Sequence, residues 1–141
     1  MVDAVGIIVC GVFAALAGLH LYWAAGGRFG ADVTVPTVDG KASFTPSPTA
    51  TVIVAGAFIL AMIVVLGRIG ALDDLAPEWL FRWGTWAIAL VFLLRAIGEF
   101  NLVGFFKRVR NTQFARWDTF VYSPLCVAIA AMMAIVGGTA D

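Results

Sequence analysis

Four long apolar stretches, separated by polar segments, constrain the fold of this chain more than any other feature of its sequence. They run over residues 4–25, 49–67, 78–100 and 119–137. A helix needs about 20 mainly apolar residues to cross a bilayer, and each stretch reaches that length. We therefore predict an all-α, polytopic membrane protein with four transmembrane helices in an antiparallel bundle.

Composition supports this class of fold and limits the partners. Hydrophobic residues make up 62% of the 141 residues and charged residues only 13%, with a mean hydropathy of +0.97. In soluble domains charged residues alone reach about 25%. Four spans and their connections use the available length, so we predict a single domain over residues 1–141. The formal net charge is zero, and we expect no nucleic acid as a partner.

The segment between the third and fourth spans holds a dense group of charges. Arg95 and Glu99 lie one helical turn apart, which predicts an i,i+4 ion pair at the end of the third span. Apolar residues then recur at helical spacing, namely Leu102, Phe105, Phe106 and Val109. This pattern predicts an amphipathic interfacial helix between the third and fourth spans. The cations that we expect at the anionic lipid surface are Lys107, Arg108, Arg110 and Arg116.

Residues 26–48 form a long connection rich in Gly, Pro and Thr. The turn dipeptide Asp39-Gly40 lies between short extended segments, which indicates a small hairpin. A connection of this length is either a solvated crossover or a lid over a binding site, and the sequence leaves both interpretations open.

The cation distribution predicts an orientation. Four spans put the first and third connections on one side of the membrane, and both termini with the second connection on the other. The first side carries most of the cations outside the spans, namely Arg28, Lys41, Lys107, Arg108, Arg110 and Arg116, whereas the second carries Arg68 and Arg82. The positive-inside rule therefore places the first and third connections in the cytoplasm and both termini outside.

Polar residues gather at the cytoplasmic end of the predicted bundle. His20 and Arg95 each lie five residues before the end of a span, which corresponds to a depth of roughly 7–8 Å. We predict that His20, Arg95 and Glu99 form one coupled cluster. The candidate ligand-binding residues are His20, Trp23, Arg95, Glu99, Asn101, Lys107, Asp118, Tyr122 and Ser123. Each also has a purely structural interpretation, such as snorkelling of Arg95 or a core hydrogen bond from His20.

Metal and cofactor sites are poorly supported by the residues present. The chain has one histidine, no Cys-x-x-Cys pair and no carboxylate at ligand spacing from that histidine. We therefore expect neither a bound metal nor a cofactor. Cys10 and Cys126 lie inside different apolar spans, where we interpret them as small buried residues.

Several motifs together give a family resemblance. They are HLYWAAGG at residues 20–27, RAIGEFNLVGFFK at 95–107, FARWD at 114–118 and YSPLC at 122–126. In these motifs the chain resembles an uncharacterised family of short four-helix bacterial membrane proteins, catalogued only as a domain of unknown function. The resemblance implies a multi-pass protein of the bacterial inner membrane and brings no activity, substrate or cofactor.

Three classes of function fit these features. The first is binding of an amphiphile with an anionic headgroup, such as a lipid, an isoprenoid or a quinone-like molecule. The second is an enzyme acting on such an amphiphile, with His20 or Glu99 as general base and Arg95 as electrostatic stabiliser. The third is an accessory subunit of a larger membrane complex or a homo-oligomer, which small residues on the helix faces favour.

Overall fold

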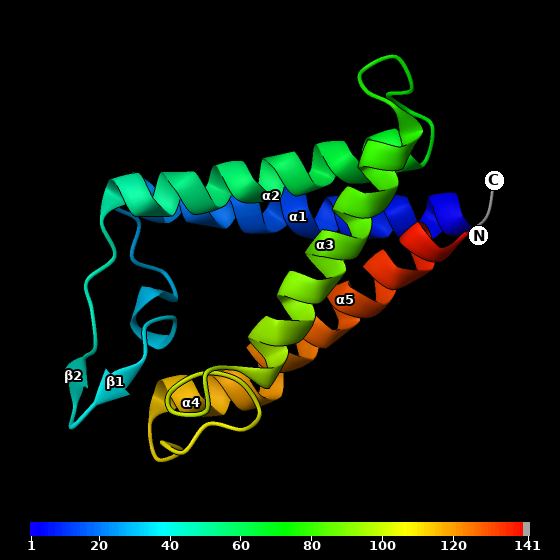
Figure 1. The fold of residues 1–141 in the computed structure, drawn as a ribbon. Helices are drawn as coiled ribbons and strands as arrows, with labels where there is room; N and C mark the ends of the chain where they lie inside the picture. Colours follow the sequence, from blue (N-terminus) through cyan, green and yellow to red (C-terminus); the bar gives the residue numbers. More distant parts are fainter. Residues whose placement is uncertain (140–141) are drawn as a thin grey trace.

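A computed structural model of the chain describes residues 1–139 and is mainly helical (Figure 1). The long helices are α1 (Val2–Ala24), α2 (Pro48–Arg68), α3 (Glu78–Ile97) and α5 (Ser123–Gly138). The short helix α4 (Gln113–Trp117) and the π-helix η2 (Asp118–Tyr122) precede α5 and join it in one helical segment, Gln113–Gly138. α1, α2, α3 and this joined segment are each long and apolar enough to cross a membrane. The prediction of an all-α chain with four spans is therefore confirmed.

The long helices form two antiparallel pairs, α1 with α2 and α3 with α5 (Figure 1). The pairs lie close together near the two chain termini and diverge toward the opposite end. We call that opposite end, formed by residues 25–47 and 98–122, the open end. The predicted bundle thus has a packed half and a splayed half.

The core lies where the two pairs meet. Its buried residues come from all the long helices and are Val9, Cys10, Phe13, Ala61, Val65, Ala89, Ile129 and Met133. Phe13 is fully buried, and its ring centroid lies 6.1 Å from that of Phe58 and 5.8 Å from that of Phe92. This aromatic contact joins α1 to α2 and α3.

The connection from α1 to α2 runs across the open end. It contains the 3-10 helix η1 (Ala31–Val33) and the predicted hairpin, whose strands are β1 (Thr37–Val38) and β2 (Lys41–Ala42). Asp39 and Gly40 have φ values of +50° and +76°, as a tight hairpin turn with both central residues left-handed requires. The Tyr122 hydroxyl, on the α5 side, donates to the Val33 carbonyl at 3.1 Å. The connection is therefore attached to both helix pairs.

α2 begins with a complete N-terminal cap. The Ser47 hydroxyl accepts a hydrogen bond from the Ala50 N–H at 3.1 Å, and Pro48 occupies the first turn. The cap fixes the point at which the connection ends and the span begins, which is also where the walls of the cavity described below start.

The predicted amphipathic helix between the third and fourth spans is absent, and this prediction was wrong. Residues 98–112 form an irregular loop. Gly98 and Gly104 both have a φ of +87°, and the Phe105 N–H donates to the Ala96 carbonyl at 2.8 Å, so the chain folds back on the end of α3. A Cβ atom on either glycine would collide with the backbone of the opposing segment. The apolar periodicity was misleading because Lys107, in the middle of the pattern, is buried, whereas an amphipathic helix would leave it at the surface.

Candidate functional site

Asp118 is the centre of a buried charge cluster at the open end. Its side chain is fully buried at the start of η2. One carboxylate oxygen, Oδ1, accepts from Arg95 Nη2 at 2.9 Å. The other, Oδ2, accepts from Lys107 Nζ at 3.0 Å and from the Gly104 N–H at 2.7 Å. The cluster therefore joins the end of α3, the 98–112 loop and the start of the fourth span.

Lys107 has a structural position in this cluster. Its side chain is 1% exposed, and besides Asp118 its ammonium donates to the Gly104 carbonyl at 3.0 Å and to Thr119 Oγ1 at 2.6 Å. An ammonium has three N–H donors, so these bonds use all of them. The expectation that Lys107 faces the lipid surface was wrong. Its ammonium binds the buried carboxylate of Asp118 and does not bind anionic headgroups. Arg108, Arg110 and Arg116 are exposed.

Arg95 is the member of the cluster that has donors left. The cluster contains two cations and one anion, so it carries one excess positive charge. Only Nη2 of Arg95 bonds to Asp118, while Nη1 is buried without a hydrogen-bond partner among the described residues. The Arg95 side chain is 35% exposed. A buried unpaired donor is unfavourable, and the exposed part of the Arg95 side chain makes the excess charge accessible to an anion from outside the chain.

Glu99 does not pair with Arg95, and that prediction was wrong. Its carboxylate is exposed and accepts the backbone N–H groups of Leu102 and Val103, where it helps to shape the loop. Arg95 instead reaches Asp118, because α3 ends at Ile97 and Glu99 is no longer on the helix.

Three further candidates have different surroundings. Asn101 is exposed, and its backbone carbonyl accepts from the N–H groups of Arg108 and Val109. Ser123 is buried, and its hydroxyl has no hydrogen-bond partner among the described residues. Tyr122 connects η2 to the α1–α2 connection through its bond to Val33.

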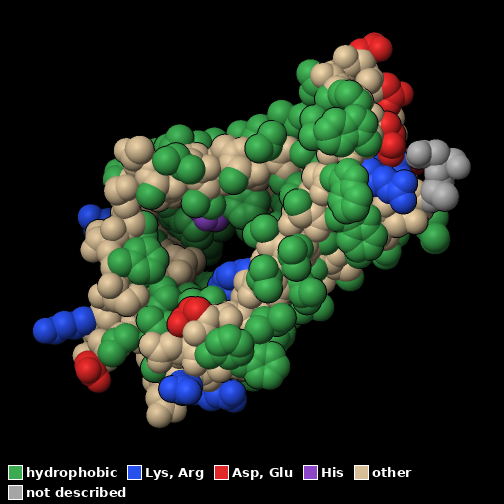
Figure 2. Space-filling view, in the orientation of Figure 1, with side chains coloured by type: hydrophobic (Ala, Val, Ile, Leu, Met, Phe, Trp, Pro, Cys, Tyr) green, Lys and Arg blue, Asp and Glu red, His purple; other side chains and the backbone are tan. Residues whose placement is uncertain are grey.

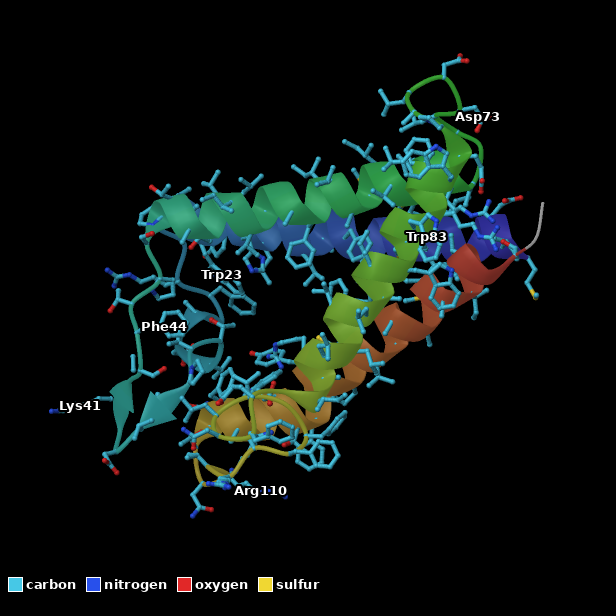
Figure 3. The ribbon with its side chains drawn as sticks, in the orientation of Figure 1. Trp23, Lys41, Phe44, Asp73, Trp83 and Arg110 are labelled. Atoms are coloured by element: carbon cyan, nitrogen blue, oxygen red, sulfur yellow. The ribbon has the colours of Figure 1, made fainter. Side chains whose placement is uncertain are left out.

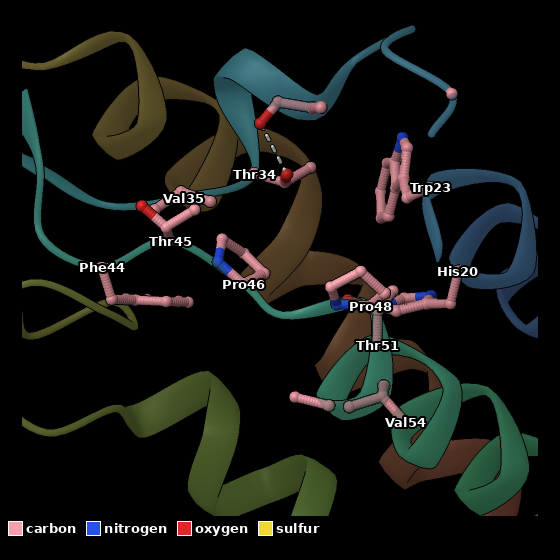
Figure 4. Close-up of a pocket in the computed structure, with 13 residues that line it drawn as sticks. His20, Trp23, Thr34, Val35, Phe44, Thr45, Pro46, Pro48, Thr51 and Val54 are labelled. Atoms are coloured by element: carbon pink, nitrogen blue, oxygen red, sulfur yellow. Dashed lines mark hydrogen bonds between the residues drawn. The ribbon is translucent and has the colours of Figure 1, made fainter. Parts of the chain in front are cut away.

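A cavity of about 510 Å³ lies on the other side of the open end, between the end of α1, the start of α2 and their connection (Figure 4). Its lining residues are His20, Trp23, Gly27, Ala31, Thr34, Val35, Phe44, Thr45, Pro46, Pro48, Ala50, Thr51 and Val54. The connection supplies much of this wall. Trp23 extends from α1 into the space between the helix pairs (Figure 3).

His20 is held by its own helix and by aromatic neighbours. Nδ1 lies 2.7 Å from the Leu16 carbonyl oxygen. The ring packs edge-on against Trp23, with centroids 5.1 Å apart, and against Phe58 at 5.2 Å. The ring extends from α1 toward Pro48 and Thr51 at the start of α2 (Figure 4).

The surface between the helix pairs is hollowed at this end (Figure 2). The histidine visible in the hollow is His20, since the chain has only one. A Lys or Arg side chain faces the hollow from the side opposite the histidine. The hollow is thus bordered by largely apolar surface, with one imidazole and one cation across from each other.

In the structure the three residues of the predicted cluster, His20, Arg95 and Glu99, each have different partners. Arg95 lies in the Asp118 cluster and His20 in the cavity, and within residues 1–139 no hydrogen bond or ring contact joins them. Asp118 was among the residues predicted from the sequence, but its bonds to both Arg95 and Lys107 were not predicted. The sequence did contain a signal for this pairing. Asp118 is an acidic residue in a segment that otherwise carries several cations, so it is a natural partner for one of them.

Comparisons with known proteins give a family and nothing beyond it. The sequence model of one family, described as a protein of unknown function (DUF3995), matches residues 13–133. No curated protein and no solved structure matches the chain. The matched range includes the cavity and the whole Asp118 cluster.

Proposed function

The chain belongs to the DUF3995 family, and for this member we propose that it binds an amphiphile with an anionic headgroup at the open end of its helix pairs. The observation that carries this proposal is the cavity beside His20 and Trp23, which opens at the level where the pairs diverge. Its volume of about 510 Å³ lies within the range of ordinary small-molecule sites, which is roughly 300–1,000 Å³.

The walls of the cavity suit an apolar chain. Apart from His20 and the threonines, the lining consists of apolar side chains and glycine, with aromatic surface from Trp23 and Phe44. In this proposal the hollow between the helix pairs, in which the histidine is visible, is the path of the ligand's tail (Figure 2). A hydrophobic tail lying in that path would cover surface that is otherwise exposed between the pairs.

The charge cluster suits an anionic headgroup. The Asp118 cluster carries one excess positive charge, and Nη1 of Arg95 has no hydrogen-bond partner in the described chain. A phosphate or carboxylate would accept from this guanidinium in a short, charge-assisted hydrogen bond. The exposed Arg108, Arg110 and Arg116 would attract anionic headgroups to the same end of the molecule.

Filling the cavity is expected to prevent binding. In the Val54→Phe variant a larger side chain enters the cavity from α2, whereas in Val52→Phe the same change lies outside the cavity on the same helix. Native mass spectrometry would measure retention of dioleoylphosphatidylglycerol and dioleoylphosphatidylcholine by the purified protein in a mild detergent. We expect the wild-type chain and Val52→Phe to retain more phosphatidylglycerol than phosphatidylcholine. Val54→Phe is expected to retain at least about fivefold less phosphatidylglycerol than the wild-type chain. Equal retention by the two variants would contradict the proposal.

We also propose that the open end faces the cytoplasm. Lys41 and Arg110 lie at the open end, whereas Asp73 lies at the opposite end with the connection between α2 and α3 (Figure 3). The positive-inside rule then puts the open end inside and both termini outside. In cells, Lys41→Cys is expected to be shielded from a membrane-impermeant thiol reagent and Asp74→Cys to react. The reverse pattern would mean that the site faces outward.

A further inference from the structure

Four polar residues that line the cavity, His20, Trp23, Thr34 and Thr51, have their side-chain hydrogen bonded to a backbone carbonyl. The Leu16 carbonyl can only accept, so Nδ1 of His20 must carry the hydrogen of their 2.7 Å bond. In the neutral ring, Nε2 then carries a lone pair and can only accept. Among the described residues nothing donates to Nε2, and His20 lines the cavity.

Three other cavity residues show the same arrangement. Trp23 Nε1 donates to the Phe29 carbonyl at 2.8 Å. The Thr34 hydroxyl donates to the Ala31 carbonyl and the Thr51 hydroxyl to the Ser47 carbonyl, each at 2.9 Å. Each threonine oxygen keeps its acceptor capacity after donating its hydrogen. The donors of all four side chains are therefore bonded to the backbone, and His20 and the two threonines keep acceptors for a ligand.

A site with free acceptors requires a ligand with donors. A cationic donor such as an ammonium is disfavoured, because no acidic residue lines the cavity and the Asp118 cluster already has one excess positive charge. A neutral hydroxyl donates without adding charge. An aliphatic hydroxyl also fits a mainly apolar cavity better than an ion does.

We propose that the ligand is an anionic amphiphile with a hydroxylated headgroup, and that His20 Nε2 accepts a hydrogen bond from one of those hydroxyls. This inference rests on the proposed function, since it specifies the headgroup of the same ligand. The chemical class is a phosphodiester lipid that carries a polyol such as glycerol. Arg95 binds the phosphate, and His20 distinguishes the hydroxyl-bearing headgroup from one of equal charge without hydroxyls.

Two lipids of equal charge test this inference. Dioleoylphosphatidylglycerol and dioleoylphosphatidylmethanol share the phosphodiester charge and the acyl chains, and only the first has headgroup hydroxyls. By native mass spectrometry of an equimolar mixture, we expect the wild-type chain to prefer the glycerol lipid by about three- to tenfold, the range of one net hydrogen bond. His20→Phe keeps an aromatic ring without an acceptor and is expected to abolish the preference. His20→Gln has a carbonyl oxygen near the position of Nε2 and is expected to keep part of it.

Two further arms separate the possible failures. Arg95→Gln leaves Lys107 and Asp118 as a balanced pair, and it is expected to lower retention of both lipids without changing their ratio. If the wild-type chain retains both lipids equally while Val54→Phe reduces both, the hydroxyl inference is wrong and the proposed function stands. If the wild-type chain retains neither lipid above a phosphatidylcholine control, the proposed function fails as well. Because the wild-type ratio is itself decisive, the test does not depend on the folding of any variant.

Discussion

Asp118→Asn is expected to lower the free energy of unfolding by about 3–5 kcal/mol, the range for removing one partner of a buried ion pair. The amide would leave Arg95 and Lys107 beside each other without a counter-charge, and Lys107 is almost completely buried. Thermal or denaturant unfolding in detergent, followed by circular dichroism, measures the loss. Asp74→Asn, an exposed residue in the connection between α2 and α3, is the matched control and should change stability by less than about 0.5 kcal/mol.

Lys107→Met distinguishes charge balance from simple loss of contacts. This change leaves Arg95 and Asp118 as a one-to-one pair while a methionine of similar length fills the space. Lys107→Met should therefore lower the free energy of unfolding by less than Asp118→Asn does, although both changes remove the ion pair between Lys107 and Asp118. The double variant should be more stable than Asp118→Asn alone, because one of the two stranded cations is gone. Strictly additive losses would show that the three charges do not act as one cluster.

The fold was largely predictable because the bilayer limits what an apolar stretch can do. A run of about 20 apolar residues has to satisfy its backbone within itself, so each of the four runs becomes a helix with little dependence on the rest of the chain. Short-range chemistry also predicted the hairpin at Asp39-Gly40, since few turns accept two left-handed residues. The divergence of the two helix pairs was not visible, because it depends on how the long helices pack against one another.

The loop after α3 shows where sequence periodicity fails. Phe105, Phe106 and Val109 have helical spacing, but the backbone around them is set by Gly98, Gly104 and the ion pair of Lys107. An amphipathic pattern is evidence for a helix only if the charged positions stay in water or headgroups. Here the charged residue Lys107 binds buried Asp118 in the fourth span, 11 residues away in sequence.

The sequence predicted that the polar residues gather at one end of the bundle, but it did not predict their pairing. The rise of 1.5 Å per residue places His20 and Arg95 at similar levels in the membrane. It does not say which face of the helix each occupies, and in the structure the two belong to different helix pairs. The pairing of Arg95 with Asp118 was not predictable in this way, because it depends on the packing of α3 against the fourth span.

Gly104→Ala is expected to destabilise the protein by about 3 kcal/mol or more, because strain and overlap act together. Its φ of +87° is unfavourable for a residue with a side chain, and the added Cβ would overlap the Ile97 carbonyl and the Gly98 Cα. Gly56→Ala is the matched control. A Cβ at Gly56, within α2, meets nothing within 4 Å, so that change should be neutral or stabilising by up to about 1 kcal/mol in the same unfolding measurement.

The loss of stability caused by Gly104→Ala should also depend on the charge cluster. The Gly104 N–H donates to Asp118 and its carbonyl accepts from Lys107, so a shift of this backbone disturbs both bonds. In the Lys107→Met background one of these bonds is already absent, and Gly104→Ala should then cost less than in the wild-type chain. An unchanged cost would mean that the loop conformation and the cluster are independent. A reduced cost would mean that the backbone conformation at Gly104 and the charge cluster stabilise each other.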